Sequence, residues 1–359
     1  MKDLLRFSSL IPVLLGAALA LAGCSSTQME GTGPGNGTTP GQAAPGWFGG
    51  YVDVTLPPGP KLQNTAAGRA TMVLAFITAD PGRRCTPSWG GTLSLDDADS
   101  KLQLDSKIRQ FRAAGNDIAV SFGGQRGQEL AAACQDADAV ADAYRAVINR
   151  YALDVVDLDI EGQATGPGAA DVRARAIARL QAERPDGRPL RVWLTLPVAR
   201  DGLSSAGKTS VQTMLDAGVE LTGVNIMTMN FGPLPNGENM LSASRHAAEA
   251  TYKTLEQLYS EAGKPAEAGN VWKSIGLTPM IGDNDVEGNL FSLQDAKGLN
   301  SFANEHQVGR LSLWSVNRDT ACSASGKEEQ QRPSVYCSGT NQEPGDFARV
   351  LSNGFTGGS

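Results

Sequence analysis

The chain has 359 residues, of which 41% are hydrophobic and 19% charged, so it can bury a large core and is not disordered as a whole. Its formal net charge of −7 argues against a nucleic-acid partner, because phosphate binding scales with Lys and Arg contacts, and favours a neutral substrate. The two histidines, His246 and His306, lie far apart, which argues against a histidine-built zinc site and against a Ser–His or Cys–His nucleophile.

The first 23 residues have the features of an export signal. Lys2 and Arg6 precede an apolar run over residues 10–22, which is too short to span a bilayer comfortably and is typical of a signal-peptide core. The run ends in LAGC, which resembles the lipobox of bacterial lipoproteins. We therefore expect cleavage before Cys24, lipid on Cys24, and a chain anchored to the cell envelope or released outside the cell. In the alternative, Cys24 is incidental to an ordinary signal peptide.

Residues 24–46 follow as a segment built mostly from Gly, Thr, Pro, Ser and Ala. Such a composition cannot bury enough apolar surface to fold and predicts a flexible tether. Its random-coil span is roughly 25 Å, which would hold the folded part, residues 47–359, clear of a membrane.

The remaining four cysteines are Cys85, Cys134, Cys322 and Cys337. In an exported chain they predict two disulfides, with three possible pairings. A Cys322–Cys337 bond would clip one loop near the end of the chain, and a Cys85–Cys134 bond would join two early loops. The spacing matches no zinc motif, so we expect no metal.

From Trp47 onward, apolar strand candidates alternate with amphipathic helical patterns. The strand candidates are residues 50–55, 71–78, 117–122, 155–160, 191–197, 223–229, 272–279 and 310–316. The helix candidates are residues 100–114, 136–151, 169–183, 210–217, 243–262 and 292–306. Eight strands with mostly helical crossovers predict an α/β fold, a single (β/α)8 TIM barrel, with its site at the C-terminal strand ends. A doubly wound sheet is the alternative, but no Gly-rich phosphate loop follows a strand.

The most informative stretch reads DVVDLDIE over residues 154–161. With the period of two of a strand, Asp157, Asp159 and Glu161 share one face, and the apolar residues share the other. The acidic face would point into the barrel with Glu161 at its mouth. Three confined carboxylates cannot all ionise cheaply, so at least one should keep its proton, as a general acid must. A solvated acidic face and a Mg²⁺ or Ca²⁺ site are the alternatives.

This stretch resembles the D-x-x-D-x-D-x-E signature of glycoside hydrolase family 18, the chitinase-like enzymes. Other stretches agree in order: SFGG at 121–124, NIMTMN at 225–230 and LWS at 313–315 resemble the family's third, sixth and eighth strands. CTPSWGG at 85–91 and TPMIG at 278–282 resemble bacterial members. The resemblance covers roughly residues 47–320.

The resemblance implies retaining, substrate-assisted hydrolysis of a substrate that bears N-acetylglucosamine, without a cofactor. Glu161 would protonate the glycosidic oxygen, and the substrate's own acetamido oxygen would attack the anomeric carbon. Asp159 would orient the acetamido group and stabilise the oxazolinium ion, while Asp157 would hold or share a proton with Asp159.

The resemblance also suggests substrate-binding residues, each with a plainer alternative. Trp314 offers a plate for the sugar ring, or packs the core at a strand end. Phe76 is a substrate-side aromatic or core filling, and Trp89 lines an outer sugar subsite or covers the core beside Cys85. Gly124 and the glycine before it either let the backbone approach the sugar closely or simply form a turn.

The sixth strand departs from the family pattern while keeping Met227 near the substrate. Where the family has Tyr and then Asp, this chain has Met229 and Asn230. A thioether cannot replace the hydroxyl, and an amide cannot ionise, although Asn230 can still donate and accept hydrogen bonds at the substrate. We expect the replacement of Tyr and Asp by Met229 and Asn230 to shift the rate of hydrolysis or its pH optimum.

The expected function is therefore hydrolysis of chitin or chito-oligosaccharides by an enzyme that we expect to be a monomer. One rival is an endo-β-N-acetylglucosaminidase that acts on N-glycans, which would differ in its cleft loops. Another is a non-catalytic, lectin-like glycan binder. Because the chain ends soon after the eighth strand, we expect soluble oligomers or accessible chains as substrate instead of crystal surfaces.

Overall fold

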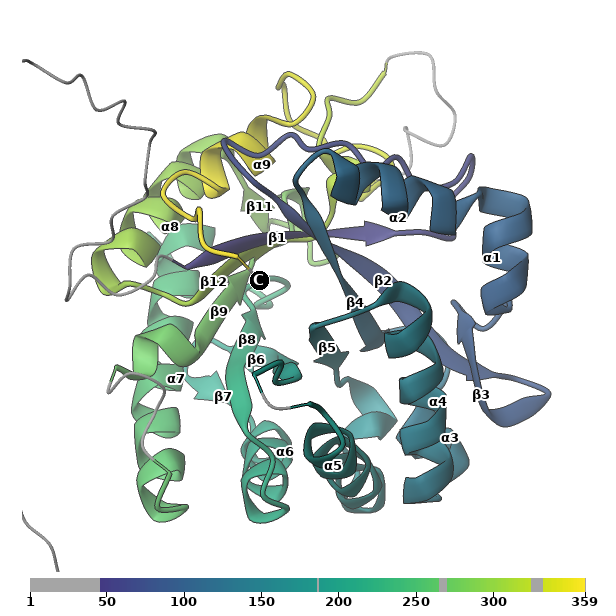
Figure 1. Ribbon diagram of the computed structural model, residues 1–359. Helices are drawn as coiled ribbons and strands as arrows, with labels where there is room; N and C mark the ends of the chain where they lie inside the picture. Colours follow the sequence, from purple (N-terminus) through teal and green to yellow (C-terminus); the bar gives the residue numbers. More distant parts are fainter. Residues whose placement is uncertain (1–45, 186, 265–269, 324–331, 359) are drawn as a thin grey trace, which may run out of the picture. The chain divides into compact units, whose positions relative to one another are not determined.

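The computed structural model describes residues 46–185, 187–264, 270–323 and 332–358. The export signal, Cys24 and nearly all of the tether lie outside the described residues. Within the described part, eight parallel strands close into a barrel, with helices around it (Figure 1). The pairings of β1 with both β2 and β12 close the ring, which confirms the TIM barrel and excludes the open doubly wound sheet.

The barrel strands fall where alternating or apolar runs predicted them. They are β1 (Trp47–Asp53), β2 (Thr71–Asp80), β4 (Asp117–Gly123), β5 (Val155–Asp159), β6 (Arg191–Ala199), β8 (Leu221–Met227), β9 (Ile275–Thr278) and β12 (Arg310–Leu313). Three strands are shorter than expected: β5 ends at Asp159, β9 spans only Ile275–Thr278, and β12 ends at Leu313. Trp272 lies in a 3-10 turn before β9, because the Asn270 side chain caps that turn by accepting from the Trp272 N–H. β8 has the expected length but starts two residues earlier and ends before Met229.

The principal helices are α1 (Leu95–Leu102), α2 (Leu104–Ala113), α4 (Ala137–Tyr151), α5 (Pro167–Ala182), α6 (Ser205–Asp216), α7 (Met240–Glu261) and α8 (Leu293–His306). Short helices α3 (Leu130–Cys134) and α9 (Asp346–Leu351) were not predicted. The helix expected over 100–114 is two helices, because Gln103 adopts a left-handed φ of 57° between them. No helix of the described residues is long and apolar enough to cross a membrane.

In the described ranges, three antiparallel hairpins are added to the eight barrel strands. β3 (Arg83–Trp89) folds back antiparallel on β2, and β7 (Gly202–Leu203) pairs with the end of β6. β10 (Gly282–Asp283) and β11 (Leu290–Phe291) form a separate small hairpin. These hairpins extend the barrel beyond the strand ends.

Of the three possible pairings of the four cysteines, the structure has the one that joins neighbours in the sequence. Cys85 on β3 is bonded to Cys134 at the end of α3, and Cys322 is bonded to Cys337 in the segment after β12. The first bond therefore fastens the β2–β3 hairpin to the β4–α4 connection.

The barrel has two distinct packed layers. Apolar side chains on the outer faces of the strands, such as Val156 and Leu158, are buried in the large core shared with the helices. Inside the barrel, a smaller cluster contains Trp47, Tyr51 and Trp193. Gly223 makes room for it, because a Cβ there would lie 2.5 Å from the Trp193 ring.

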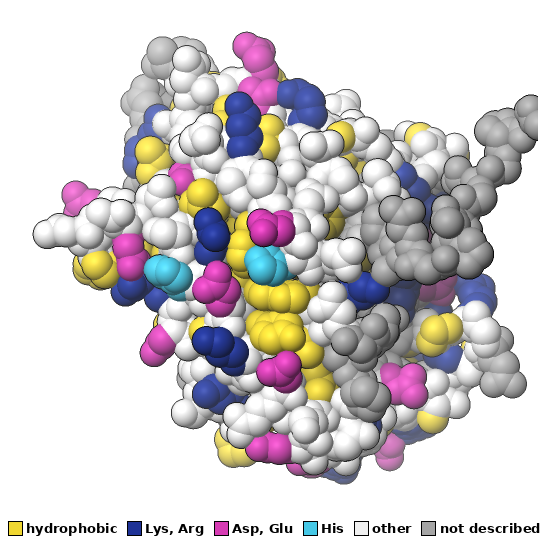
Figure 2. Space-filling view, turned by 90° about the vertical axis from the view of Figure 1, so that its left-hand side faces the viewer, with side chains coloured by type: hydrophobic (Ala, Val, Ile, Leu, Met, Phe, Trp, Pro, Cys, Tyr) yellow, Lys and Arg dark blue, Asp and Glu magenta, His cyan; other side chains and the backbone are white. Residues whose placement is uncertain are grey.

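The outer surface carries charges of both signs. On the flank drawn in Figure 2, basic and acidic side chains are interspersed and do not gather by sign. That pattern is the ordinary solvated exterior of a barrel, whose functional sites lie at the C-terminal strand ends.

Candidate active site

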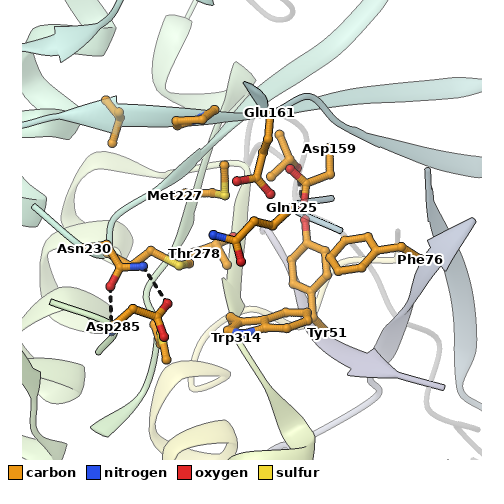
Figure 3. A pocket seen from close by; sticks show the side chains of 15 residues that line it. Tyr51, Phe76, Gln125, Asp159, Glu161, Met227, Asn230, Thr278, Asp285 and Trp314 are labelled. Carbon is orange, nitrogen blue, oxygen red and sulfur yellow. Dashed lines mark hydrogen bonds between the residues drawn. The ribbon is translucent and has the colours of Figure 1, made fainter. Parts of the chain in front are cut away.

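A pocket of about 320 Å³ opens at the C-terminal ends of the barrel strands. Every barrel strand or the loop directly after it contributes a side chain: Tyr51, Phe76, Gln125, Asp159, Thr195, Met227, Thr278 and Trp314, in chain order. Figure 3 shows Glu161 and Trp314 on opposite sides of this pocket, with Gln125 between them. The pocket therefore lies where the barrel fold predicts an active site.

The acidic strand is oriented as its period of two predicted. Asp157 and Asp159 are buried inside the barrel, and Glu161, just past the end of β5, lines the pocket. Asp157 lies deepest and accepts four hydrogen bonds within 2.9 Å, from Tyr51, Ser121, Thr195 and Arg310. Its acceptor positions are filled by protein donors, which leaves none for a metal ion.

Asp159 and Glu161 differ from Asp157 in their partners. Burial, followed by the negative charges of Glu161 and Asp157, raises the pKa of Asp159 well above its ordinary value. Burial also raises the pKa of Glu161. Among the described residues, the buried Oδ1 atom of Asp159 has no hydrogen-bond partner. The pair therefore retains a proton more readily than exposed carboxyl groups do, as general-acid chemistry requires.

In the described residues, no group of three or more His, Cys, Asp or Glu side chains is arranged to hold a metal ion. The carboxylates of the acidic strand are instead spaced along β5, with the deepest one paired to a guanidinium.

Three aromatic side chains form one wall of the pocket. The rings of Phe76 and Trp314 stack with centroids 5.4 Å apart and an angle of 25°, and Tyr51 meets the Trp314 ring edge-on at 6.1 Å. The Ala75–Phe76 and Trp314–Ser315 peptide bonds are both cis. Phe76 and Trp314 thus pack against each other and also line the pocket.

The two glycines at the end of β4 are required by the packing of the protein itself. Gly123 and Gly124 have φ values of 106° and 84°, which favour glycine. A Cβ on Gly123 would lie 2.0 Å from the Asp159 carbonyl oxygen, and one on Gly124 would lie 2.8 Å from the Phe76 ring. Gly123 therefore allows β4 and β5 to approach each other, and Gly124 allows Phe76 to pack against the chain beside them.

Met227 at the end of β8, and Met229 and Asn230 just after it, lie on the pocket wall. Asn230 has a φ of 53° and forms a reciprocal pair with Asp285: its Nδ2 donates to the Asp285 carboxylate at 3.0 Å, and the Asp285 N–H donates to its Oδ1 at 2.9 Å (Figure 3). Asp285 also lines the pocket. A carboxylate is therefore present beside the amide, supplied by the loop after β10.

Trp89 is not at the site, so its substrate-binding interpretation is wrong. Its side chain is fully buried, and its indole N–H donates to the Tyr151 hydroxyl at 3.0 Å. Trp89 ends β3, and the β2–β3 hairpin turns its ring toward α4, so it covers the core, which is the alternative that the sequence had left open.

A second hollow, of about 1020 Å³, adjoins Glu161 on the side of α3 and α5. Gln125, Gln128 and Gln163 contribute amide groups to its lining. Behind this wall, Arg173 on α5 donates to Glu129 at 3.0 Å and to the Ala164 carbonyl oxygen at 2.9 Å. The turn directly after Glu161 is therefore held by a buried ion pair.

Several site residues were not identified from the sequence. They are Tyr51, Gln125, Thr195, Asn225, Thr278, Asp285 and Arg310. The alternation of side chains along a strand could have identified some of them, because Arg310, Ser312 and Trp314 occupy alternate positions. Asp285 lies on a loop, where no periodic signal exists.

Comparisons with known proteins add to this geometry, although no family model matches the chain. The chain is 31% identical over 277 residues to the probable bifunctional chitinase/lysozyme of Escherichia coli (strain K12), covering 75% of this chain and 30% of that protein. It is 31% identical over 278 residues to endochitinase 11 of Metarhizium anisopliae, covering 75% and 52%. The chain thus spans about a third to a half of these relatives.

Solved structures agree. The catalytic domain of the hyperthermophilic chitinase from Pyrococcus furiosus matches with a TM-score of 0.72 and 30% identity, over 86% of this chain and 96% of that one. A GH18 chitinase from Pseudoalteromonas aurantia shares the fold, with a TM-score of 0.52 and 16% identity over 75% of this chain and 94% of that one.

The barrel, its acidic strand and these relatives define a glycoside hydrolase. Within that class, the chain belongs to the chitinase-like glycoside hydrolase family 18.

Proposed function

We propose that this chain hydrolyses β-1,4 bonds between N-acetylglucosamine units of chitin or chito-oligosaccharides, by a retaining, substrate-assisted mechanism with Glu161 as general acid and base. The observation that carries the proposal is the placement of Glu161 across the pocket from the stacked Phe76 and Trp314 rings. A sugar ring resting on Trp314 would present its glycosidic bond toward the carboxyl group.

In the first step, Glu161 donates its proton to the glycosidic oxygen as the bond to the anomeric carbon breaks. The substrate's acetamido oxygen forms the new bond to that carbon and gives an oxazolinium ion. The raised pKa of Glu161 supports this step, because the donor must be protonated near neutral pH. The leaving sugar would lie toward the hollow that Gln125, Gln128 and Gln163 line.

In the second step, the Glu161 carboxylate takes a proton from water as the water oxygen attacks the anomeric carbon. The ring of the oxazolinium ion opens, the acetamido group is restored, and Glu161 is protonated again. Asp159 lies beside the reacting centre, where it would orient the acetamido group and stabilise the positive charge. Met227, Met229 and Asn230 would border the same group from β8.

The test is the release of reducing ends from chitotetraose by the wild type and by Glu161→Gln. The amide keeps the size of the side chain but cannot donate the proton, so we expect a loss on the order of 10²–10⁴-fold in kcat. Glu249→Gln, on the exposed surface of α7, is the matched control and should retain full activity.

An N-glycoprotein substrate, assayed alongside, separates the rival functions. Trimming of the glycoprotein without cleavage of chitotetraose would move the assignment to an endo-β-N-acetylglucosaminidase. Binding of chitotetraose without hydrolysis of either substrate would leave a glycan-binding protein. Strong retention on crystalline chitin would contradict the preference for soluble or accessible chains.

We further propose that Cys24 is lipidated and that a monomeric barrel is thereby attached to the cell envelope. The support is the LAGC sequence after a charged start and an apolar run. Metabolic labelling with a fatty acid should mark the wild type and leave Cys24→Ala unlabelled; label on both proteins would refute it.

A further inference from the structure

Arg310 is a fully buried cation inside the barrel, beneath the pocket. Its side chain has no exposed surface, and it donates to Asp157 at 2.6 Å, to the Tyr51 hydroxyl at 2.9 Å and to Ser312 at 2.9 Å. Its guanidinium carbon lies 4.7, 5.4 and 5.6 Å from the ring centroids of Trp47, Tyr51 and Trp193. Rings and hydrogen bonds therefore fix both its position and its charge.

The groups around Asp157 can all donate hydrogen bonds to it. The Tyr51 oxygen accepts from Arg310 and from the Asn225 amide at 3.2 Å, and the Thr195 oxygen accepts from the same amide at 3.0 Å. The two hydroxyl oxygens also lie 3.0 Å from each other, but Asp157 accepts from them at 2.9 and 2.6 Å, and both hydroxyl hydrogens can point at it at once. With Ser121 and Arg310, Asp157 has a donor for each of about four lone pairs.

Asp159 has the opposite surroundings. It is buried two residues further along the strand, and its Oδ1 finds no hydrogen-bond partner in the part of the chain that the structure describes. Arg310 donates to Asp157 instead. The charged and titratable groups that bear on Asp159 are Glu161, Asp157 and Arg310. The same strand therefore carries one carboxyl group that is saturated with donors and one that has an unused oxygen.

We propose that Arg310 is a positioning residue of the reaction: it fixes Asp157 as an ionised carboxylate, so that Asp159 and Glu161 alone hold the proton of the acidic strand. This refines the expectation that Asp157 shares a proton with Asp159. A proton that is taken up or released during the reaction then resides on Asp159 or Glu161 and not on Asp157. The inference rests on the proposed hydrolase function.

The test is the pH dependence of kcat/KM for chitotetraose in wild type and Arg310→Met. Removing the cation disfavours every ionised carboxyl group on the strand, so both limbs of the profile should move to higher pH, by about one unit or more. A role in folding alone would lower the whole profile without moving its limbs, and that result would overturn the proposal.

Two matched variants separate charge from packing. Arg310→Lys keeps the cation and loses the planar geometry, so its limbs should stay near the wild-type positions while kcat falls. Ser312→Ala removes an uncharged partner of Arg310 on the same strand and should also leave the limbs in place. Limbs that move as far in either variant as in Arg310→Met would contradict the proposal.

A neutron crystal structure of the wild type near neutral pH keeps the proposal testable if Arg310→Met does not fold. Deuterium on Asp159 or Glu161 and none on Asp157 is the expected result; deuterium on an Asp157 oxygen overturns it. This measurement reports protonation whether or not chitotetraose is a substrate, so failure of the proposed function and failure of this inference remain distinguishable.

Discussion

Two buried arginine–carboxylate pairs flank β5, one inside the barrel and one outside it. Arg310 and Asp157 are both 0% exposed at 2.6 Å, and Arg173 and Glu129 are 1% and 2% exposed at 3.0 Å. Their chemistry is the same, but their surroundings differ. The inner pair joins β12 to β5 beneath the pocket, whereas the outer pair joins α5 to the residue that caps the start of α3.

The outer pair is a structural clamp. Glu129 also accepts from the N–H groups of Ala131 and Ala132 at the start of α3 and from the Tyr144 hydroxyl at 2.6 Å. Burial alone would raise the pKa of Glu129, but Arg173 and these hydrogen bonds hold it below its ordinary value. The comparison teaches that a buried ion pair can fix a loop or fix a protonation state, depending on which carboxyl groups lie beside it.

Breaking the outer pair should have the largest effect on stability. Arg173→Met leaves the Glu129 charge buried and uncompensated, so we expect a loss of about 3–5 kcal/mol in the free energy of unfolding, measured by urea denaturation. Arg175→Met, on the same helix, breaks an exposed pair with Asp171 and should cost about 1 kcal/mol or less. Equal losses would show that the Arg173–Glu129 pair is not a clamp.

The opposite pKa directions predict opposite stability effects of pH. Glu129 stabilises the fold above the ordinary carboxyl range and loses that contribution as pH falls through its lowered folded pKa. Asp159 has a raised pKa, so its stabilising contribution is present at low pH and lost as pH rises through the folded pKa.

Consequently, Asp159→Asn should raise the melting temperature at pH 7–8, and the gain over wild type should shrink toward pH 4. Glu129→Gln should lower the melting temperature at pH 7, with the loss shrinking as the pH falls below the ordinary carboxyl range. Calorimetry across this pH range checks both signs. A wild type that is more stable than Asp159→Asn at pH 8 would contradict the raised pKa.

The smallest expected effect concerns the Asn230–Asp285 pair at the pocket mouth. Asn230→Ala removes two hydrogen bonds to Asp285 in an exposed setting, so we expect a rise in KM for chitotetraose of about threefold to tenfold with little change in stability. Gln257→Ala, which removes an exposed amide on α7, is the control. An unchanged KM would mean that the pair does not border the substrate.

The sequence predicted the barrel because strand and helix periods alternate along it, and it predicted the orientation of Asp157, Asp159 and Glu161 because side chains on a strand alternate faces. It did not predict the β2–β3 hairpin, whose Arg83–Trp89 strand is polar at its start and buried only at its end. That omission explains the wrong interpretation of Trp89.

The inner ion pair was missed for a different reason. Arg310 opens its strand, where a charged residue is ordinarily solvated, and nothing local shows that β1, β5 and β6 supply Tyr51, Asp157 and Thr195 around it. Such a network depends on barrel closure, since its members are far apart in sequence. Asp285 likewise reaches Asn230 only through the fold.

The anomeric configuration of the first product tests the central claim most directly. Proton NMR during the first turnovers of chitotetraose would follow the new reducing end before mutarotation. Substrate-assisted catalysis through Glu161 predicts that the β anomer appears first and that Glu161→Gln yields no signal. Initial formation of the α anomer would contradict the mechanism, because a single displacement by water would then replace the acetamido group.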